Sequence, residues 1–201
     1  MRCAIFMTMA LCAFSNSLRA EEGFWPFDMV PRDKIEKRYE FTVTDAWLDT
    51  ARRASLRVSA GGSASFVSPH GLIMTNRHVV ASTLQRMSVP GKTDLIRDGF
   101  LAKTRADEIR QPGGFRVENL SVDQLVEIVN VNEKVRTLAA ERFSGNEENA
   151  LQSIARAANN SESRPIRFQP VKLYPEGEYR LYKFKTYTDV RMVFAADLSS
   201  G

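Results

Sequence analysis

Two short apolar runs on either side of residues 69–71 most constrain what this chain can fold into. Residues 63–68, SASFVS, and residues 71–76, GLIMTN, have strand-like composition, and Pro69-His70-Gly71 between them are turn residues. The two runs are therefore predicted to form a β-hairpin with His70 at its tip. The preceding Gly61-Gly62 is small enough to let a facing backbone come close.

The second run leads to His78, one of only two histidines in the chain. A lone histidine is more often structural than catalytic. A histidine placed just past a rigid strand, however, is how double-barrel serine peptidases aim a general base at a serine hydroxyl. His78 is therefore the candidate catalytic residue. The hydroxyl of Thr75 and the side chain of Asn76 are expected to position the loop, and a short helix is predicted after His78.

The rest of the chain predicts a mainly β protein with helices, of α+β class. Residues 44–56 have helical spacing with Thr44 as N-cap, and Gly61-Gly62 is expected to end that helix. The prolines within residues 21–41 exclude a helix there and suggest an extended aromatic arm. Three further segments follow: a strand that becomes helical at 124–135, helices over 136–160 interrupted near Ser144-Gly145, and strands over 164–197 split at 175–177.

The first 20 residues have the layout of a secretory signal peptide. Arg2 is a positive start, residues 4–14 are apolar, and Ala20 is a suitable cleavage residue. The apolar run is too short for the about 20 residues that cross a bilayer, so no membrane span is expected. Both cysteines, Cys3 and Cys12, lie in this segment. The mature chain is therefore predicted to be periplasmic or secreted and to contain no disulfide.

The charge balance argues against an anionic partner. The chain has 28 basic and 24 acidic residues, and removing Arg2 and Arg19 with the leader leaves 26 against 24. A net charge of +2 is too even to predict binding to nucleic acid or an anionic membrane surface. Basic residues alternate with aromatics in the C-terminal strands, as at Lys183, Lys185 and Arg191, and are interpreted as solvated strand faces. No cofactor or metal site is predicted.

Residues 62–80, GSASFVSPHGLIMTNRHVV, resemble two peptidase families. One is the Deg-type heat-shock serine proteases, and the other is the bacterial dipeptidyl-peptidase 7 and 11 family, serine-peptidase family 46. Four flanking segments resemble only the second family and occur in the same order: EGFWPFDMVP, TDAWLDTARRASLR, DGFLAKTRADEI and YKFKTYTDVRMVFA. The chain is therefore identified as similar to this family from about Glu22 to about Ala195.

This resemblance implies a secreted exopeptidase that releases dipeptides from free peptide N-termini. The implied fold is a chymotrypsin-like double β-barrel, of which residues 21–201 would be an incomplete, truncated N-terminal part. His78 matches the triad histidine, although Arg77 and Val79 replace the histidine and cysteine that usually flank it. The implied partners are peptide substrates, and a homodimer is a possibility for the full-length enzyme.

The same resemblance places the triad aspartate and serine beyond the end of this chain. Local substitutes are not convincing: Asp94 is followed by polar residues where a barrel strand would continue, and no glycine elbow follows Ser63, Ser65 or Ser68. The chain is therefore expected to be inactive alone, and unpaired strand edges are expected to make it prone to aggregation. Two alternatives stay open: a Deg-like secreted endoprotease and a non-catalytic secreted binding module.

Overall fold

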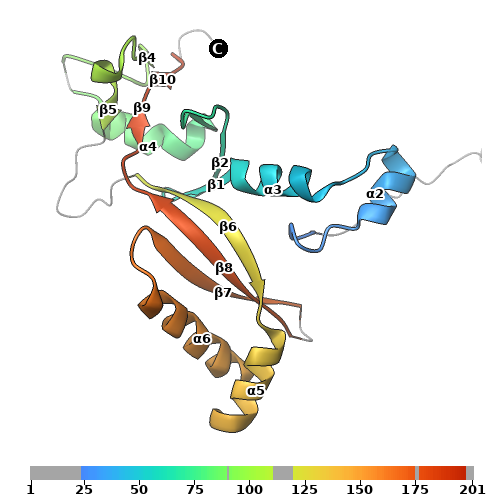
Figure 1. Cartoon of the computed structure of the whole chain (residues 1–201). Coiled ribbons are helices and arrows are strands. Elements are labelled where there is room, and N and C mark those ends of the chain that lie inside the picture. Colours follow the sequence, from blue (N-terminus) through green and yellow to red (C-terminus); the bar gives the residue numbers. More distant parts are fainter. Residues whose placement is uncertain (1–23, 90, 111–119, 175–176, 198–201) are drawn as a thin grey trace, which may run out of the picture. The chain divides into compact units, whose positions relative to one another are not determined.

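The structure is a computed structural model that describes residues 24–89, 91–110, 120–174 and 177–197. The chain divides into two compact units, Met1–Thr42 and Val43–Gly201, and each is described by itself. Element labels are those of Figure 1. The predicted signal peptide and the Pro-Gly-Gly turn at residues 112–114 lie outside the described residues.

The first unit contains a helix that the sequence analysis excluded. Helix α2 spans Arg32–Tyr39 and begins directly after Pro31, whose φ of −77° suits the start of a helix. Proline disrupts a helix only from inside it, so the density of prolines before residue 32 did not prevent a helix after it. The helix ends at Glu40, which adopts a left-handed conformation and donates its N–H to the Glu36 carbonyl. The prediction of an extended arm is therefore wrong for these residues.

The second unit begins with the predicted helix, which is shorter than expected. Helix α3 spans Asp45–Ala54, and the Thr44 hydroxyl caps it by accepting the Trp47 N–H. Strand β1, Ser55–Val58, follows immediately and buries Leu56 and Val58 while Ser55 and Arg57 face solvent. This two-residue period is that of a strand. The assignment of Leu56 to the helix was wrong because four residues are too few to reveal a change of period.

A six-stranded antiparallel sheet organises the second unit, in the order β3-β2-β1-β6-β8-β7. Figure 1 shows β6, β8 and β7 as long twisted strands. The remaining strands are β2 (Ser63–Phe66), β3 (Ile73–Thr75), β6 (Val122–Asn130), β7 (Ile166–Leu173) and β8 (Glu178–Tyr187). β2 and β3 form the predicted hairpin, with Phe66 opposite Ile73. In the described part of the chain β3 and β7 remain the two edges, so the sheet is open, as predicted for an incomplete barrel.

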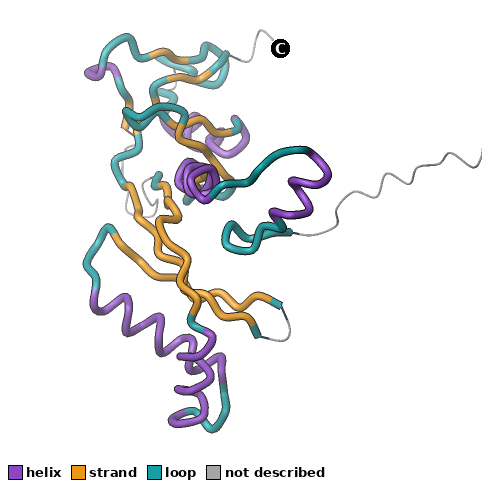
Figure 2. The backbone as a smooth tube through the Cα atoms, turned by 45° about the vertical axis from the view of Figure 1, so that its right-hand side comes forward, coloured by secondary structure: helices purple, strands orange, loops and turns teal. Residues whose placement is uncertain are grey.

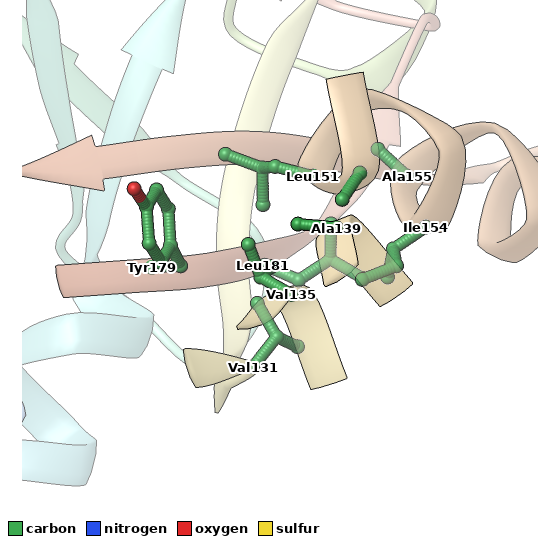
Figure 3. Close-up of a cluster of buried hydrophobic side chains, with 9 residues drawn as sticks. Val131, Val135, Ala139, Leu151, Ile154, Ala155, Tyr179 and Leu181 are labelled. Atoms are coloured by element: carbon green, nitrogen blue, oxygen red, sulfur yellow. The ribbon is translucent and has the colours of Figure 1, made fainter. Parts of the chain in front are cut away.

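Two helices pack against one end of this sheet, as the tube view of Figure 2 shows. Helix α5 spans Asn132–Arg142 and helix α6 spans Glu147–Ser161, with the predicted break at Ser144-Gly145 between them. Their apolar faces meet two residues of β8, Tyr179 and Leu181, in the cluster drawn in Figure 3. The other members of this buried cluster are Val131, Val135, Ala139, Ala150, Leu151, Ile154 and Ala155.

A third helix and two small sheets complete the second unit. Helix α4, Arg77–Met87, buries Leu84 and Met87 with Leu95. Strand β4 (Phe100–Leu101) pairs with β10 (Phe194–Ala195), and β5 (Ile109–Arg110) pairs with β9 (Arg191–Met192). A 3-10 turn, Arg105–Asp107, joins β4 and β5. The architecture combines helices with antiparallel sheets, which confirms the predicted α+β class.

Candidate active site

His78 lies at the start of helix α4, three residues after the end of β3. Asn76 has extended backbone angles, φ −73° and ψ 144°, and its carbonyl accepts the Val79 N–H at 3.1 Å. The helix therefore begins at Arg77, two residues earlier than predicted, and His78 is in its first turn. The His78 side chain is exposed, and its imidazole forms no hydrogen bond within the described parts of the chain.

The hairpin holds the backbone that precedes His78. The Thr75 hydroxyl donates a hydrogen bond of 2.7 Å to the Ser63 carbonyl, across the β2–β3 pair. The prediction that Thr75 positions this loop is thus confirmed. Asn76 occupies the N-cap position, but its side chain makes no capping hydrogen bond, so that part of the prediction is wrong. Within the described residues, the exposed imidazole is thus presented by a fixed backbone rather than by hydrogen bonds of its own.

An open hollow lies beside the first turn of α4. Its wall consists of the β2–β3 hairpin, residues 187–196 and part of α4, and Arg77 belongs to it whereas His78 does not. The wall is largely apolar, and four of its members are well exposed to solvent: Val67, Leu72, Met74 and Phe194. Its volume of about 1390 Å³ exceeds the roughly 300–1,000 Å³ of small-molecule pockets. The hollow is therefore larger than a typical small-molecule pocket.

One carboxylate in this wall has a shifted pKa. Arg191 donates hydrogen bonds of 3.1 and 2.9 Å to Asp189, and this hydrogen bonding holds the pKa of Asp189 below its usual value. Arg110 lies 3.7 Å from the same carboxylate and adds to the effect. Asp189 is therefore ionised at neutral pH and is paired with arginine, which makes it a structural carboxylate.

The second histidine is placed where the sequence predicted. His70 lies exposed in the tight turn of the β2–β3 hairpin and lines the hollow. The Ser68 hydroxyl accepts the N–H groups of His70 and Leu72 at 3.3 and 3.1 Å, which stabilises this turn. Ser68 is thus structural, as predicted.

The remaining candidate residues also take part in local structural contacts. The Ser65 hydroxyl donates to the Phe66 carbonyl at 3.2 Å, and the Ser63 carbonyl accepts the Thr75 hydroxyl. Asp94 accepts the N–H groups of Ile96 and Arg97 at 3.1 and 3.0 Å, which is a local turn. Within the described residues, none of these serines and neither oxygen of Asp94 forms a hydrogen bond with His78. Sequence reasoning and structure agree that His78 stands without a triad partner among them.

The basic residues of the C-terminal strands are occupied in local contacts. Lys183 binds Glu162 at 2.9 Å, and this hydrogen bond raises the pKa of the Lys183 ammonium. Lys185 lies over the ring of Tyr187, and Arg191 pairs with Asp189. These contacts agree with the interpretation of solvated strand faces. Among the described residues, no three His, Cys, Asp or Glu side chains lie close enough together to hold a metal ion.

The sequence analysis did not find the charged cluster centred on Asp123 in β6. This carboxylate accepts hydrogen bonds from Arg57 at 3.0 Å, from Arg167 at 2.6 Å and from the Thr186 hydroxyl at 2.6 Å. Both guanidinium groups also lie over the ring of Phe184, at 5.0 and 4.7 Å from its centroid. The partners come from three different strands, so no local pattern in the sequence signals the cluster. These contacts join β1, β7 and β8 to β6 through one carboxylate, which indicates a structural role.

The comparison with known proteins identifies relatives along nearly the whole chain. The family described as Peptidase S46 matches residues 20–201. Dipeptidyl-peptidase 7 of Porphyromonas gingivalis is 31% identical over 204 residues, which cover 95% of this chain and 27% of the relative. An Asp/Glu-specific dipeptidyl-peptidase of Capnocytophaga gingivalis is 27% identical over 98% of this chain and 28% of its own length.

A solved structure has the same fold. The crystal structure of Porphyromonas endodontalis DPP11 in complex with substrate matches with a TM-score of 0.71 at 24% identity, over 89% of this chain and 27% of that one. The chain thus spans about a quarter of the length of the relatives it matches. Among the described residues, no helix combines the length and apolar character of a membrane span. The family match over residues 20–201 establishes that this chain belongs to the Peptidase S46 family.

Proposed function

We propose that this chain is the N-terminal part of a serine-type dipeptidyl-peptidase in which His78 is the general base. The observation that carries the proposal is the match to Peptidase S46 over residues 20–201. Two features support the role of His78: its motif resembles that of the family's triad histidine, and its imidazole is exposed at a fixed helix start. The matched relatives that are named above are dipeptidyl-peptidases, which supports the reaction class.

In the proposed reaction, the imidazole of His78 takes the proton of a serine hydroxyl as the serine oxygen attacks a substrate carbonyl carbon. The peptide C–N bond then breaks, and the proton passes from the imidazolium to the leaving amine. Water, deprotonated by the same imidazole, attacks the acyl-enzyme. The bond between the serine oxygen and the acyl carbon then breaks, the imidazolium returns the proton to the serine oxygen, and the dipeptide leaves with a free carboxylate. The substrate is a peptide with a free N-terminus, and the bond cleaved is the second from that end.

The serine and the aspartate of this mechanism have no counterpart among the motifs of the 201 residues. Loss of the nucleophile or the base lowers turnover by about six orders of magnitude in a well-studied serine protease. We therefore propose that the 201-residue polypeptide alone is inactive. In the active enzyme further polypeptide supplies these groups and covers the apolar wall of the hollow, since such surfaces commonly mark interaction sites.

The remaining parts of the proposal concern location and assembly. Residues 1–20 are proposed to direct export to the periplasm or the exterior, with cleavage after Ala20. N-terminal sequencing of the exported protein should then begin at Glu21. A homodimer of the full-length enzyme is proposed from the family resemblance, and light scattering of that enzyme tests it.

A graft tests the reaction directly. Residues 24–197 replace the matching segment of the Porphyromonas gingivalis dipeptidyl-peptidase 7, and dipeptide release is measured from peptides with free and with acetylated N-termini. We expect the graft to release dipeptides from the free peptides only. His78→Ala should abolish this activity, whereas His70→Ala, at the hairpin tip, should retain it. The isolated 201-residue chain should release no dipeptide.

The outcomes separate the alternatives. A folded graft without dipeptide release, or one in which His78→Ala retains activity, overturns the proposed role. Cleavage of acetylated peptides by the isolated chain would instead support a Deg-like endoprotease. The binding module would be supported if the isolated chain were a stable monomer that unfolds cooperatively, and if neither the isolated chain nor the graft cleaved peptides. Thermal unfolding of each variant provides the check that it is folded.

A further inference from the structure

The exposed position of His78 raises the question of what fixes the direction of its side chain. Its imidazole forms no hydrogen bond within the described residues. The direction of an exposed side chain that forms no hydrogen bond depends strongly on the backbone that carries it. The residues that fix the backbone on either side of His78 therefore decide where the imidazole points.

On the C-terminal side, the adjacent residue Val79 is anchored against Gly62. Val79 is 5% exposed and packs in a buried cluster with Leu56, Val58 and Val122. A Cβ atom built on Gly62 would lie 2.6 Å from Cγ2 of Val79, far inside the about 3.5–4.0 Å of a favourable carbon contact. Val79 is β-branched and buried, so it has no free rotamer into which it can withdraw. Val79 thus occupies the space that a side chain at residue 62 would need.

On the N-terminal side, the anchor is Ser63, which follows Gly62 and begins β2. The Ser63 carbonyl accepts the Thr75 hydroxyl at 2.7 Å, three residues before His78. Gly62 precedes β2 directly and Ser63 is the first residue of β2, so one short segment contacts the chain both before and after His78. That segment is itself tied to the sheet, because the Gly62 carbonyl accepts the N–H of Val58 in β1 at 3.0 Å.

We infer that Gly62 and Ser63 are the positioning residues of His78. Gly62 leaves room for Val79, and the Ser63 carbonyl binds the Thr75 hydroxyl. Together these contacts fix the orientation of the first turn of α4 relative to β1. The inference rests on the proposed function only for what the imidazole does once it is positioned. A misplacement of about 1 Å in a catalytic group can lower turnover by about 10²-fold, so a single added methyl group at residue 62 is expected to matter.

The two adjacent glycines provide a matched control. Gly61 and Gly62 both have positive φ, +90° and +100°, so an alanine is strained at either position. A Cβ at Gly61 meets nothing within 4 Å, whereas a Cβ at Gly62 meets Val79. Gly61→Ala therefore reproduces the backbone strain without the collision, and Gly62→Ala combined with Val79→Ala removes the collision while keeping the strain.

Histidine-selective NMR on the full chain detects a change in the surroundings of each imidazole ring as a change in its chemical shift. With only two histidines, ¹³C-labelled histidine gives two Cε1–H signals, which His70→Ala assigns. We expect Gly62→Ala to shift the His78 signal and leave that of His70, and Gly61→Ala to leave both. The Gly62→Ala/Val79→Ala pair should return the His78 signal to its position in a Val79→Ala reference. Equal effects of the two glycine variants, or no return in the pair, overturn the inference.

A second pair of variants tests the Ser63 anchor without altering a glycine. Thr75→Val removes the hydroxyl and keeps the shape, whereas Thr75→Ser keeps the hydroxyl. The inference requires that Thr75→Val shifts the His78 signal and that Thr75→Ser does not. It is overturned if both variants leave the signal unchanged or both move it equally.

Kinetics of the graft separate this inference from the proposed function. In an active graft, Gly62→Ala should lower kcat by about 10²-fold with KM unchanged, and Gly61→Ala should retain kcat. An unchanged kcat in Gly62→Ala overturns the positioning role while the proposed function stands. The expected NMR shifts together with a folded but inactive graft leave the positioning role intact and overturn the proposed function.

Discussion

The side-chain amide of Asn159 in α6 forms two hydrogen bonds with the backbone of Phe168 in β7. Its Nδ2 donates to the Phe168 carbonyl at 2.9 Å, and its Oδ1 accepts the Phe168 N–H at 2.7 Å. These backbone groups point away from β8, on the open edge of the sheet. Asn159 thereby takes the place that a neighbouring strand would occupy. Farther along the same edge Pro170 has no N–H to offer, so β7 is protected against pairing with another chain.

Replacing Asn159 with alanine is expected to expose this edge. The substitution leaves the Phe168 N–H and carbonyl without partners, which should lower the free energy of unfolding by about 1–2 kcal/mol for two neutral hydrogen bonds. Free edge groups also favour strand pairing between copies, so self-association should rise. Urea unfolding and light scattering measure the two effects.

The adjacent Asn160 is the control. It is exposed on the same helix turn, and its side chain forms no hydrogen bond within the described residues, so Asn160→Ala should change neither quantity. Equal behaviour of the two variants would show that the Asn159 contacts with Phe168 do not protect the edge.

Tyr179 gives a pH dependence at the alkaline end. Its hydroxyl donates a 2.5 Å hydrogen bond to the Glu147 carboxylate, and this bond, with burial of the ring, raises the pKa of Tyr179 to about 12. An unfolded tyrosine has a pKa of about 10. The folded state therefore keeps a proton that the unfolded state has lost, and the stabilisation is complete below pH 10 and is lost as the pH rises towards 12.

The prediction for Tyr179→Phe is a flatter stability profile between pH 10 and 12. Urea unfolding at several pH values in this range gives the free energy of unfolding of the unsubstituted protein and of Tyr179→Phe. The titration of the other tyrosines and lysines cancels in the difference between the two. Parallel profiles would mean that Tyr179 has the same pKa in the folded and unfolded states.

The cluster around Asp123 is expected to contribute to stability. Asp123→Asn removes the charge that Arg57 and Arg167 share, and hydrogen bonds to charged groups contribute about 1.5–3 kcal/mol. Because both arginines are partly exposed, at 48% and 36%, we expect the unfolding free energy to fall by about 2 kcal/mol. Asp98→Asn breaks only an exposed pair with Arg97 and should leave the stability nearly unchanged. Chemical denaturation that gives the same result for both variants would contradict this role.

The buried cluster between α5, α6 and β8, here called the helix-covered core, should lose the most stability when one of its side chains is shortened. Leu151 is 1% exposed in the cluster of Figure 3, and Leu151→Ala is expected to lower the unfolding free energy by about 2–5 kcal/mol through lost burial and the cavity left behind. Leu101, at 65% exposure, is the control, because alanine there removes little buried surface. Differential scanning calorimetry should therefore show a large fall in Tm for the first variant alone.

Local signals in the sequence predicted the elements whose cause is local. The Thr44 cap, the turn at Pro69-His70-Gly71 and the break at Ser144-Gly145 depend on residues within one turn, and all three were predicted at those positions. The errors arose where two signals met in a short stretch. Helix α2 follows directly after a proline, and β1 follows directly after α3, so the wrong signal was extended across the boundary.

The candidate site divides in the same way. His78 and the Thr75 hydroxyl are recognisable from the motif, because they lie within four residues of each other. The seat of Val79 on Gly62 and the partners of Asp123 join residues that are far apart in sequence. Contacts of this kind follow from strand order and register, which a single sequence does not encode in any local pattern.

The helix-covered core has a consequence for the order of folding. Every member of its buried cluster lies between Val131 and Leu181, and β6, α5, α6, β7 and β8 are consecutive along the chain. Contacts between segments that are close in sequence form with little loss of chain entropy. This stretch is therefore expected to be the nucleus onto which the hairpin that precedes His78 later docks. Its amides should be the slowest to exchange with deuterated solvent.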